Sequence, residues 1–181
     1  MRSLAPNGRF ERGISVGCGG ASKELRLLKN GIVESFDLYE ISQVRVDEGI
    51  KLAKELGLED RVRFHVADAF DECVERDFDL VYWNNALHHM LDVGDAIRWS
   101  HNQLCVGGWC VMDDFVGACR FQWPDSQLEM ARRVREMLPS RFMLHPHLEN
   151  TSIPTSVSRP DPEALKADDP AEAADSDRIL S

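Results

Sequence analysis

Segments with the pattern of buried strands alternate with segments of helical pattern five times between residues 12 and 139. The strand-like segments are short and rich in apolar and β-branched residues, and they span 12–16, 33–39, 61–66, 78–83 and 109–112. Strands separated by helices pair in parallel through right-handed crossovers. The sequence therefore predicts the α/β class: a doubly wound, mostly parallel sheet with helices on both faces.

Capping signals mark the ends of several predicted helices. Ser42 and Asp92 each precede an apolar repeat of helical spacing, which predicts two helix N-caps. Gly57 predicts the end of the first of these helices, and residues 107–108 predict a turn after the second.

A further helix is predicted from the Ser-Gln-Leu-Glu sequence at 126–129, which is typical of a capping box, to Pro139. Its predicted buried face consists of Leu128, Ala131, Val134 and Leu138.

The first strand leads into a glycine-rich turn, Val16-Gly17-Cys18-Gly19-Gly20, and then into the helical segment 21–30. Glycine permits a tight turn and lets a ligand approach the backbone, while the free N–H groups of the helix point toward that ligand. Such a cluster can also be only a turn. Polar residues follow the other strands too, however, and strand ends converge in a doubly wound sheet. These residues are Glu40, Asp68, Asn84 and Asp113.

The polar strand ends favour one nucleotide cofactor over another. Glu40 suits a ribose because a carboxylate can accept from both hydroxyls, a feature shared with NAD-type sites. Ser22, however, occupies the position of the third glycine in the dinucleotide fingerprint. Asp68 is not needed for a dinucleotide. It could instead accept from an adenine amino group, with Ala69 and Ile41 against the ring faces.

Taken in order, these motifs resemble those of the class I S-adenosylmethionine-dependent methyltransferases, in the small-molecule methyltransferase-domain group. The matching segments lie within residues 12–123 and are Val16-Gly17-Cys18-Gly19-Gly20, Glu40-Ile41-Ser42, Ala67-Asp68-Ala69-Phe70, Asp79-Leu80-Val81, Leu87-His88-His89 and Leu104-x-x-Gly107-Gly108. The resemblance implies S-adenosyl-L-methionine as the cofactor. It also implies methyl transfer to a small-molecule acceptor by in-line displacement at the sulfonium methyl.

The resemblance also implies a role for each residue of the cofactor site. Gly17-Cys18-Gly19 would hold the methionine end of the cofactor, and Glu40 would bind the ribose. Asp68 and Ala69 would lie at the adenine, with Asn84 near the reactive methyl.

Three features depart from the family pattern. Ser15 stands where the family often has an acidic residue, and Ala21 stands where it often has a third glycine. The fold also normally adds two strands after the fifth helix, and residues 140–181 contain no candidate for them. An undetected strand or a partner subunit could explain this, but we expect a C-terminal truncation. Without those strands, the fifth strand is an exposed edge at which a partner or a second copy can bind.

If the acceptor is a hydroxyl or an amine, a base at the fourth or fifth strand end would help. The candidates are His88, His89, Asp113 and Asp114. Neighbouring histidines on a helix face different directions, so at most one is expected to reach the pocket. The histidines could equally be packed or solvated, and the aspartates could cap a loop. No metal site is predicted, because these residues lack a recognisable ligand spacing.

Composition limits the remaining possibilities. The net charge of -10 argues against non-specific nucleic-acid binding. No apolar stretch is long enough to span a bilayer and the N-terminus lacks a signal-peptide pattern, so we expect a cytoplasmic protein. The five cysteines form no C-x-x-C pair and are expected to be reduced thiols.

Three regions are predicted along the chain. Residues 1–11 form an irregular lead-in, 12–139 form the cofactor-binding domain, and 140–181, rich in Pro, Ala and Asp, are weakly structured, with a loop at 145–147. Two alternatives to a methyltransferase remain. One is a non-catalytic cofactor-binding or interaction module, suggested by the missing strands and the acidic tail. The other is an NAD-dependent oxidoreductase, which Ser22 and Asp68 disfavour.

Overall fold

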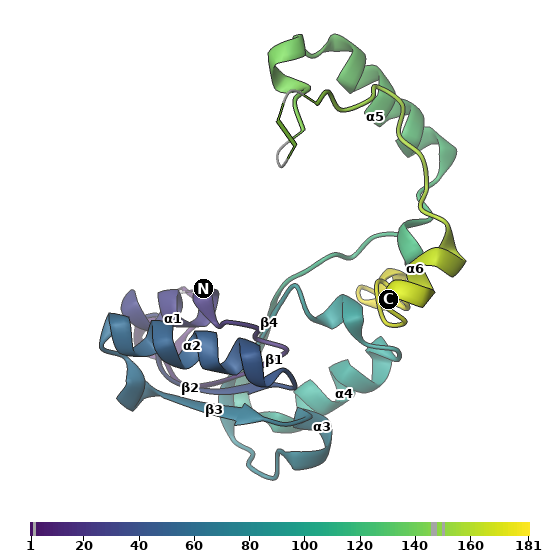
Figure 1. The fold of residues 1–181 in the computed structure, drawn as a ribbon. Coiled ribbons are helices and arrows are strands. Elements are labelled where there is room, and N and C mark those ends of the chain that lie inside the picture. Colours follow the sequence, from purple (N-terminus) through teal and green to yellow (C-terminus); the bar gives the residue numbers. More distant parts are fainter. Residues whose placement is uncertain (2, 146–147, 150) are drawn as a thin grey trace.

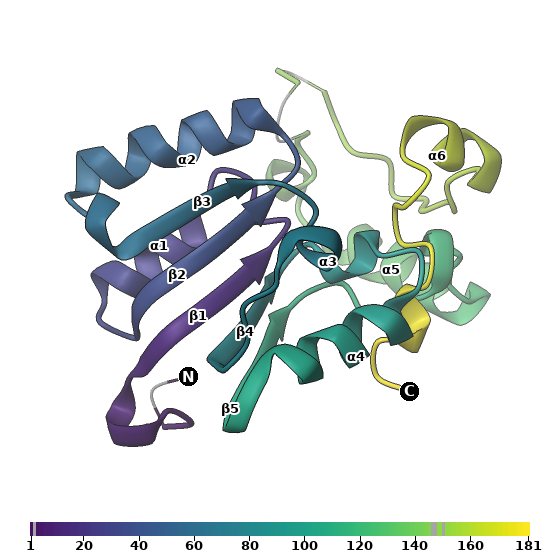
Figure 2. The same ribbon diagram turned by 90° about the horizontal axis from the view of Figure 1, so that it is seen from below.

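Five parallel strands form one sheet in the order β3-β2-β1-β4-β5 (Figure 2). The strands are β1 (Phe10–Val16), β2 (Val33–Glu40), β3 (Val62–Val66), β4 (Phe78–Asn84) and β5 (Leu104–Asp113). The structure, a computed structural model, describes residues 1, 3–145, 148–149 and 151–181. The predicted doubly wound α/β fold is confirmed.

Helices cover both faces of this sheet (Figure 1). They are α1 (Ser22–Lys29) and α2 (Gln43–Leu56) on one face, and α3 (Ala69–Glu72) and α4 (Val93–Gln103) on the other. Leu25 and Leu28 of α1 pack with Phe36 of β2, whereas Ala96 of α4 packs with Trp83 of β4. The central strands β1, β2 and β4 are therefore largely buried on both sides, as expected of parallel strands, whereas β3 and β5 contain no buried residue.

The predicted caps form as the sequence indicates. The Ser42 hydroxyl accepts from the Arg45 N–H at the start of α2, and a carboxylate oxygen of Asp92 accepts from the Asp95 N–H at the start of α4. Gly57 ends α2 in the left-handed conformation, with φ of 65°. These contacts lie within one turn of their residues, so short sequence patterns predict them.

The predicted turn at residues 107–108 is wrong. Both glycines lie inside β5, which begins at Leu104. Phe78 pairs with Leu104 and Leu80 pairs with Trp109, so one residue of β4 faces four residues of β5. Gly107 has φ of +83°, which allows the strand to bulge there.

The predictions for α5 (Asp125–Met137) are only partly correct. The helix exists, but Pro124 occupies the N-cap position and no side chain caps the end, so the capping box is wrong. The predicted buried face is also wrong, since α5 contains no buried residue and Val134 is 50% exposed. Helical periodicity predicts an apolar face but not its partner. In this fold α5 lies away from the sheet (Figure 1).

The C-terminal segment is more ordered than its composition predicts. It contains α6 (Pro162–Asp168) and a 3₁₀ turn, η6 (Ser176–Arg178), which lies beside α4 (Figure 2). Ile179 is buried in the same cluster as Val93, and the Val93 N–H donates to a carboxylate oxygen of Asp175. A few apolar contacts and one helix cap from a distant residue thus order a stretch that lacks its own core pattern.

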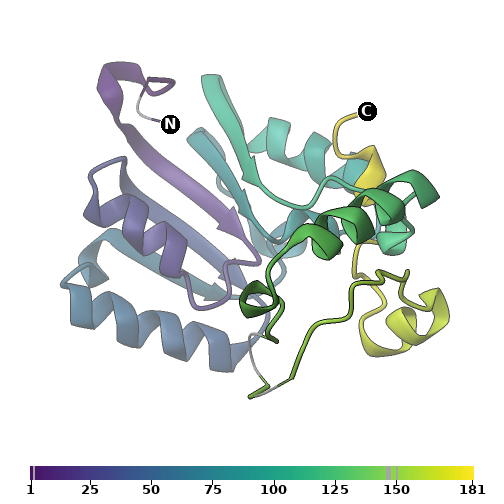
Figure 3. The ribbon, with the colours of Figure 1, turned by 90° about the horizontal axis from the view of Figure 1, so that it is seen from above.

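The described residues of 140–181 contain one isolated bridge, between Leu144 and Ser152, and no longer strand. β5 is therefore the last strand of the sheet order (Figure 3). Within the loop predicted at 145–147, residues 146–147 lie outside the described residues. No helix in the described part of the chain is both long and apolar enough to cross a membrane.

Candidate functional site

A cavity of about 860 Å³ opens at the carboxyl ends of the central strands. This volume is within the range of small-molecule binding sites, and its position is where open α/β sheets bind ligands. All eight predicted cofactor residues line it: Gly17, Cys18, Gly19, Glu40, Ile41, Asp68, Ala69 and Asn84. The topology thus brings four strand ends, which are far apart in the sequence, around one space.

The glycine loop is held tightly between β1 and α1. The Gly17 and Cys18 N–H groups donate to the Tyr39 carbonyl oxygen at 2.8 and 3.3 Å. Gly17 has φ of +64°, and a Cβ there would lie 3.0 Å from the Cβ of Ala86. The glycine therefore serves both the backbone conformation and the close approach to the β4 end.

Glu40 connects the glycine loop to α2. One carboxylate oxygen accepts from the Gly19 N–H and the other from the Ser42 N–H, each at 2.9 Å. A carboxylate has about four acceptor positions, so two such bonds leave capacity for ribose hydroxyls. The side chain is thus oriented by the backbone and available to the cavity.

Asp68 caps α3 and also lines the cavity. Its Oδ1 accepts from the Phe70 N–H at 2.9 Å and caps α3. A carboxylate with one such bond retains acceptor capacity, and Asp68 lines the cavity with Ala69 and Ile41. Ile41 is 77% exposed at this rim, so its side chain is accessible to a ligand in the cavity.

A buried carboxylate that the sequence reasoning missed lies beneath the glycine loop. Ser15 donates to Glu24 Oε1 at 2.9 Å, and both side chains are buried. Burial raises the pKa of Glu24. Glu24 on α1 therefore places a carboxylate against Ser15, the position where the family often has an acidic residue. Its only sequence signal is the serine at position 15.

Burial also raises the pKa of the Cys18 thiol, and the negative charges of Glu24 and Glu40 raise it further. Cys18 is therefore a neutral thiol at physiological pH. All five cysteines are free.

The two aspartates predicted as bases lie outside the lining of the cavity. The Asp114 side chain is fully buried, and its Oδ2 accepts from the Ala86 and Leu87 N–H groups at 2.9 and 2.8 Å. Its Oδ1 accepts from His88, through the backbone N–H at 3.2 Å and Nδ1 at 2.5 Å. Asp113 is exposed, and Asn84 Nδ2 donates to its Oδ2 at 3.4 Å. Asp114 thus holds the chain after β4.

The two histidines differ in exposure. His89 lines the cavity and is half-buried, whereas His88 lies behind it and is buried against Asp114. Of the two, only His89 is at the cavity surface, although the rings lie close together, with centroids 4.2 Å apart. Asp169 and Ala171 also line the cavity. Sequence reasoning missed them because they lie in the segment expected to be weakly structured.

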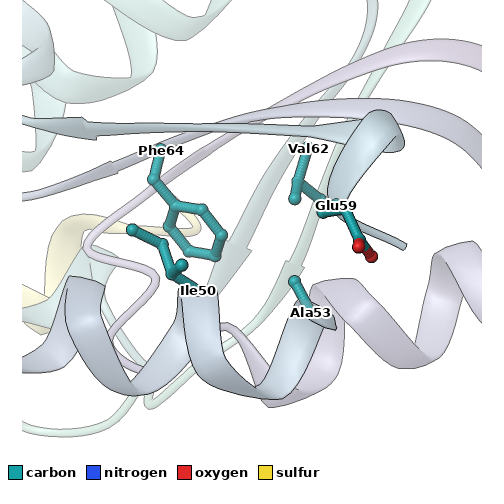
Figure 4. A pocket seen from close by; sticks show the side chains of 5 residues that line it. All are labelled: Ile50, Ala53, Glu59, Val62 and Phe64. Atoms are coloured by element: carbon teal, nitrogen blue, oxygen red, sulfur yellow. The ribbon is translucent and has the colours of Figure 1, made fainter. Parts of the chain in front are cut away.

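A second cavity, of about 220 Å³, lies between α2 and β3 (Figure 4). It is lined by the apolar residues Ile50, Ala53, Val62 and Phe64 and by the carboxylate Glu59, which Figure 4 labels. One charged group without converging polar partners does not define a ligand site. We assign no ligand to this cavity.

The chain has relatives of known family. The model of the family described as "Methyltransferase domain" matches residues 11–155. A curated relative, the 27-O-demethylrifamycin SV methyltransferase of Amycolatopsis mediterranei (strain S699), is 30% identical over 117 residues. The match covers 64% of this chain and 43% of the relative, so the chain spans less than half of the relative's length.

Solved structures share the fold. A methyltransferase from Thiobacillus denitrificans, solved in complex with S-adenosyl-L-homocysteine, superposes with a TM-score of 0.52 at 19% identity, covering 57% of this chain and 42% of that one. The YcgJ protein of Bacillus subtilis superposes with a TM-score of 0.54 at 24% identity, covering 70% and 53%. The family match and the ordered motifs agree: this chain belongs to the methyltransferase-domain family of class I S-adenosylmethionine-dependent methyltransferases.

Proposed function

We propose that this chain binds S-adenosyl-L-methionine in the 860 Å³ cavity and transfers its methyl group to a small-molecule acceptor. The main support is the convergence of eight predicted cofactor residues, from four strand ends, on one cavity. The curated relative is named for a small-molecule acceptor, 27-O-demethylrifamycin SV, which favours that acceptor class.

Each part of the cofactor has a matching group in this cavity. The Gly17–Gly19 loop presents backbone without side chains and suits the methionine end. Glu40 suits the ribose, and Asp68 suits the adenine amino group, with Ala69 against the ring. Asn84, which ends β4 and lines the cavity, would lie near the reactive methyl. The sulfonium supplies the electrophile, so these residues act mainly by orienting it for in-line displacement.

Among the four predicted bases, the geometry favours His89. It lines the cavity, which His88, Asp113 and Asp114 do not. His89 Nδ1 lies 3.2 Å from a carboxylate oxygen of Asp169. A proton on Nδ1 that donates to this carboxylate leaves the Nε2 lone pair free to accept a proton from a hydroxyl or amine.

We also propose that a second copy covers the edge of β5. In the described part of the chain, β5 pairs with β4 alone, and Val106 and Trp109 are exposed on it. Exposed apolar edge strands pair with other chains. Light scattering on the wild type should show a dimer that Val106→Lys converts to monomer, and a wild-type monomer would contradict this.

Calorimetric titration with S-adenosyl-L-homocysteine tests the proposed cofactor site. We expect saturable binding that weakens about tenfold or more in Asp68→Ala and in Glu40→Gln, because each loses a charge-assisted hydrogen bond of about 1.5–3 kcal/mol. Glu55→Gln, at the other end of α2, should bind like the wild type. Absence of binding by the wild-type chain, when circular dichroism shows that it is folded, would refute the proposal.

One further titration and one activity assay distinguish the alternatives. Binding of NAD, without binding of S-adenosyl-L-homocysteine, would favour an oxidoreductase. Tight cofactor binding without methyl transfer from labelled cofactor to any acceptor tested would favour a non-catalytic module.

A further inference from the structure

The returning C-terminal segment places a carboxylate against the histidine pair. Glu172 lies opposite His88 and His89, which belong to the 3₁₀ turn η3 (Leu87–His89). His88 Nε2 lies 3.6 Å from one oxygen of Glu172, and His89 Nε2 lies 3.9 Å from the other. We call these three residues the His-Glu cluster.

The spacing of the cluster is too long for hydrogen bonds and close to that of metal ligands. Protein hydrogen bonds to oxygen from nitrogen are about 2.7–3.2 Å long. Tetrahedral ligands at about 2.0–2.1 Å from an ion are roughly 3.3–3.4 Å apart. One ligand atom from each of the three residues lies within 4.8 Å of the others, so modest side-chain movement would bring them to that spacing.

The Nδ1 atom of each histidine lies beside a carboxylate, an arrangement that suits metal binding through Nε2. His88 Nδ1 lies 2.5 Å from Asp114 Oδ1, and His89 Nδ1 lies 3.2 Å from Asp169 Oδ2. A carboxylate that accepts from Nδ1–H leaves the lone pair on Nε2. Metal-binding histidines usually have this carboxylate or carbonyl partner. Both Nε2 atoms face the same carboxylate, Glu172.

We propose that His88, His89 and Glu172 bind one divalent transition-metal ion, with Asp114 and Asp169 as positioning residues. Two imidazole nitrogens and one carboxylate oxygen match Zn²⁺ and its neighbours better than Mg²⁺ or Ca²⁺, which prefer oxygen ligands. Three protein ligands leave one coordination position open. Because His89 lines the cavity, that position can face the acceptor side.

The ion would have two consequences for the site. It would fasten the C-terminal segment to the cavity wall through Glu172. It would also occupy the Nε2 lone pair of His89, so His89 could act as the proposed base only in a chain that has no ion bound. The site does not depend on cofactor binding. The sequence predicted no metal because the third ligand is remote from the histidines along the chain.

Calorimetric titration of the full chain with Zn²⁺, after removal of metal by EDTA and dialysis, tests the proposal. We expect one ion per chain, with affinity lowered at least about 100-fold in His89→Ala and in Glu172→Gln. Asp169→Asn should weaken binding about 10–100-fold, as expected for an outer carboxylate. His101→Ala, an exposed histidine of α4, and Glu163→Gln, an exposed carboxylate of α6, are matched controls that should bind like the wild type.

Co²⁺ provides a second readout. The wild type should develop visible absorption bands of a nitrogen- and oxygen-ligated ion, and these should be lost in His89→Ala with wild-type circular dichroism. Three results would overturn the proposal: no binding, equal binding by the wild type and Glu172→Gln, or a near-ultraviolet thiolate band that places the ion on cysteine. Because these metal titrations contain no cofactor, their results are independent of the titration with S-adenosyl-L-homocysteine.

Discussion

Asp114 is expected to be a structural brace of the site, and its removal should destabilise the fold. Its two oxygens accept four backbone N–H groups, from Ala86, Leu87, His88 and Phe115, and also face His88 Nδ1. The side chain is fully buried, so water does not replace these bonds. Each buried donor left without an acceptor costs about 1–3 kcal/mol.

The magnitude follows from the atoms that each variant removes. Asp114→Asn keeps one acceptor oxygen and points an NH₂ group at the donors of the other. If that group replaces Oδ2, the Ala86 and Leu87 N–H groups lose their acceptor, at a cost of about 3 kcal/mol. Asp114→Ala leaves all the donors unpaired, and we expect a loss of about 5 kcal/mol, the upper range for breaking a buried charged pair.

Urea unfolding at pH 7, followed by circular dichroism, measures both losses. Asp113→Asn is the matched control, because its side chain is exposed, and it should change stability by less than about 0.5 kcal/mol. Equal stability of the two asparagine variants would refute the reasoning. If Asp114→Asn lost methyl transfer without losing stability, Asp114 would again be a candidate general base.

Three further predictions concern the glycine loop and two buried carboxylates. Gly17→Ala should lower the free energy of unfolding by about 1–2 kcal/mol and remove most of the cofactor affinity, because φ is +64° and the new Cβ would contact Ala86. Gly31→Ala is the control, because Gly31 has the same φ but open space around it, and it should lose stability without losing cofactor affinity. Equal cofactor affinities of the two variants would contradict this prediction. Burial raises the pKa of Glu24, so its contribution to stability is present below pH 4.5 and lost as pH rises through the folded pKa. Glu24→Gln should therefore be more stable than the wild type at pH 7.5 but not at pH 4, by about 1.4 kcal/mol for each unit of pKa, and equal unfolding midpoints at pH 7.5 would exclude this. Burial raises the pKa of Asp37, but hydrogen bonds from Arg63, Arg12 and His65 lower it more. The contribution of Asp37 to the stability of the fold is therefore present above pH 3.8 and lost as pH falls through the folded pKa. Asp37→Asn should cost about 2 kcal/mol at pH 7 and less at pH 3 in urea unfolding, and a pH-independent loss would argue against an ionic role.

The sequence alone determined the sheet and the arrangement of its strand ends. Alternating periodicities, with caps at Ser42 and Asp92, report backbone hydrogen bonding over a few residues, so they are visible in the chain itself. Parallel connectivity then places Glu40 and Asp68 at one edge of the sheet. The roles of these residues toward the cofactor remain predictions.

Tertiary structure alone decided which distant residues meet. Glu24 reaches Ser15 from α1, and Glu172 and Asp169 reach the histidines from the far end of the chain. These pairs have no local pattern, because the contacts depend on how helices and returning segments pack. The same reason explains α5, whose apolar periodicity predicted burial but whose place away from the sheet leaves none of its residues buried. Helices, strands and caps depend on neighbouring residues and can be predicted from them, whereas contacts between distant residues form only when the chain has folded.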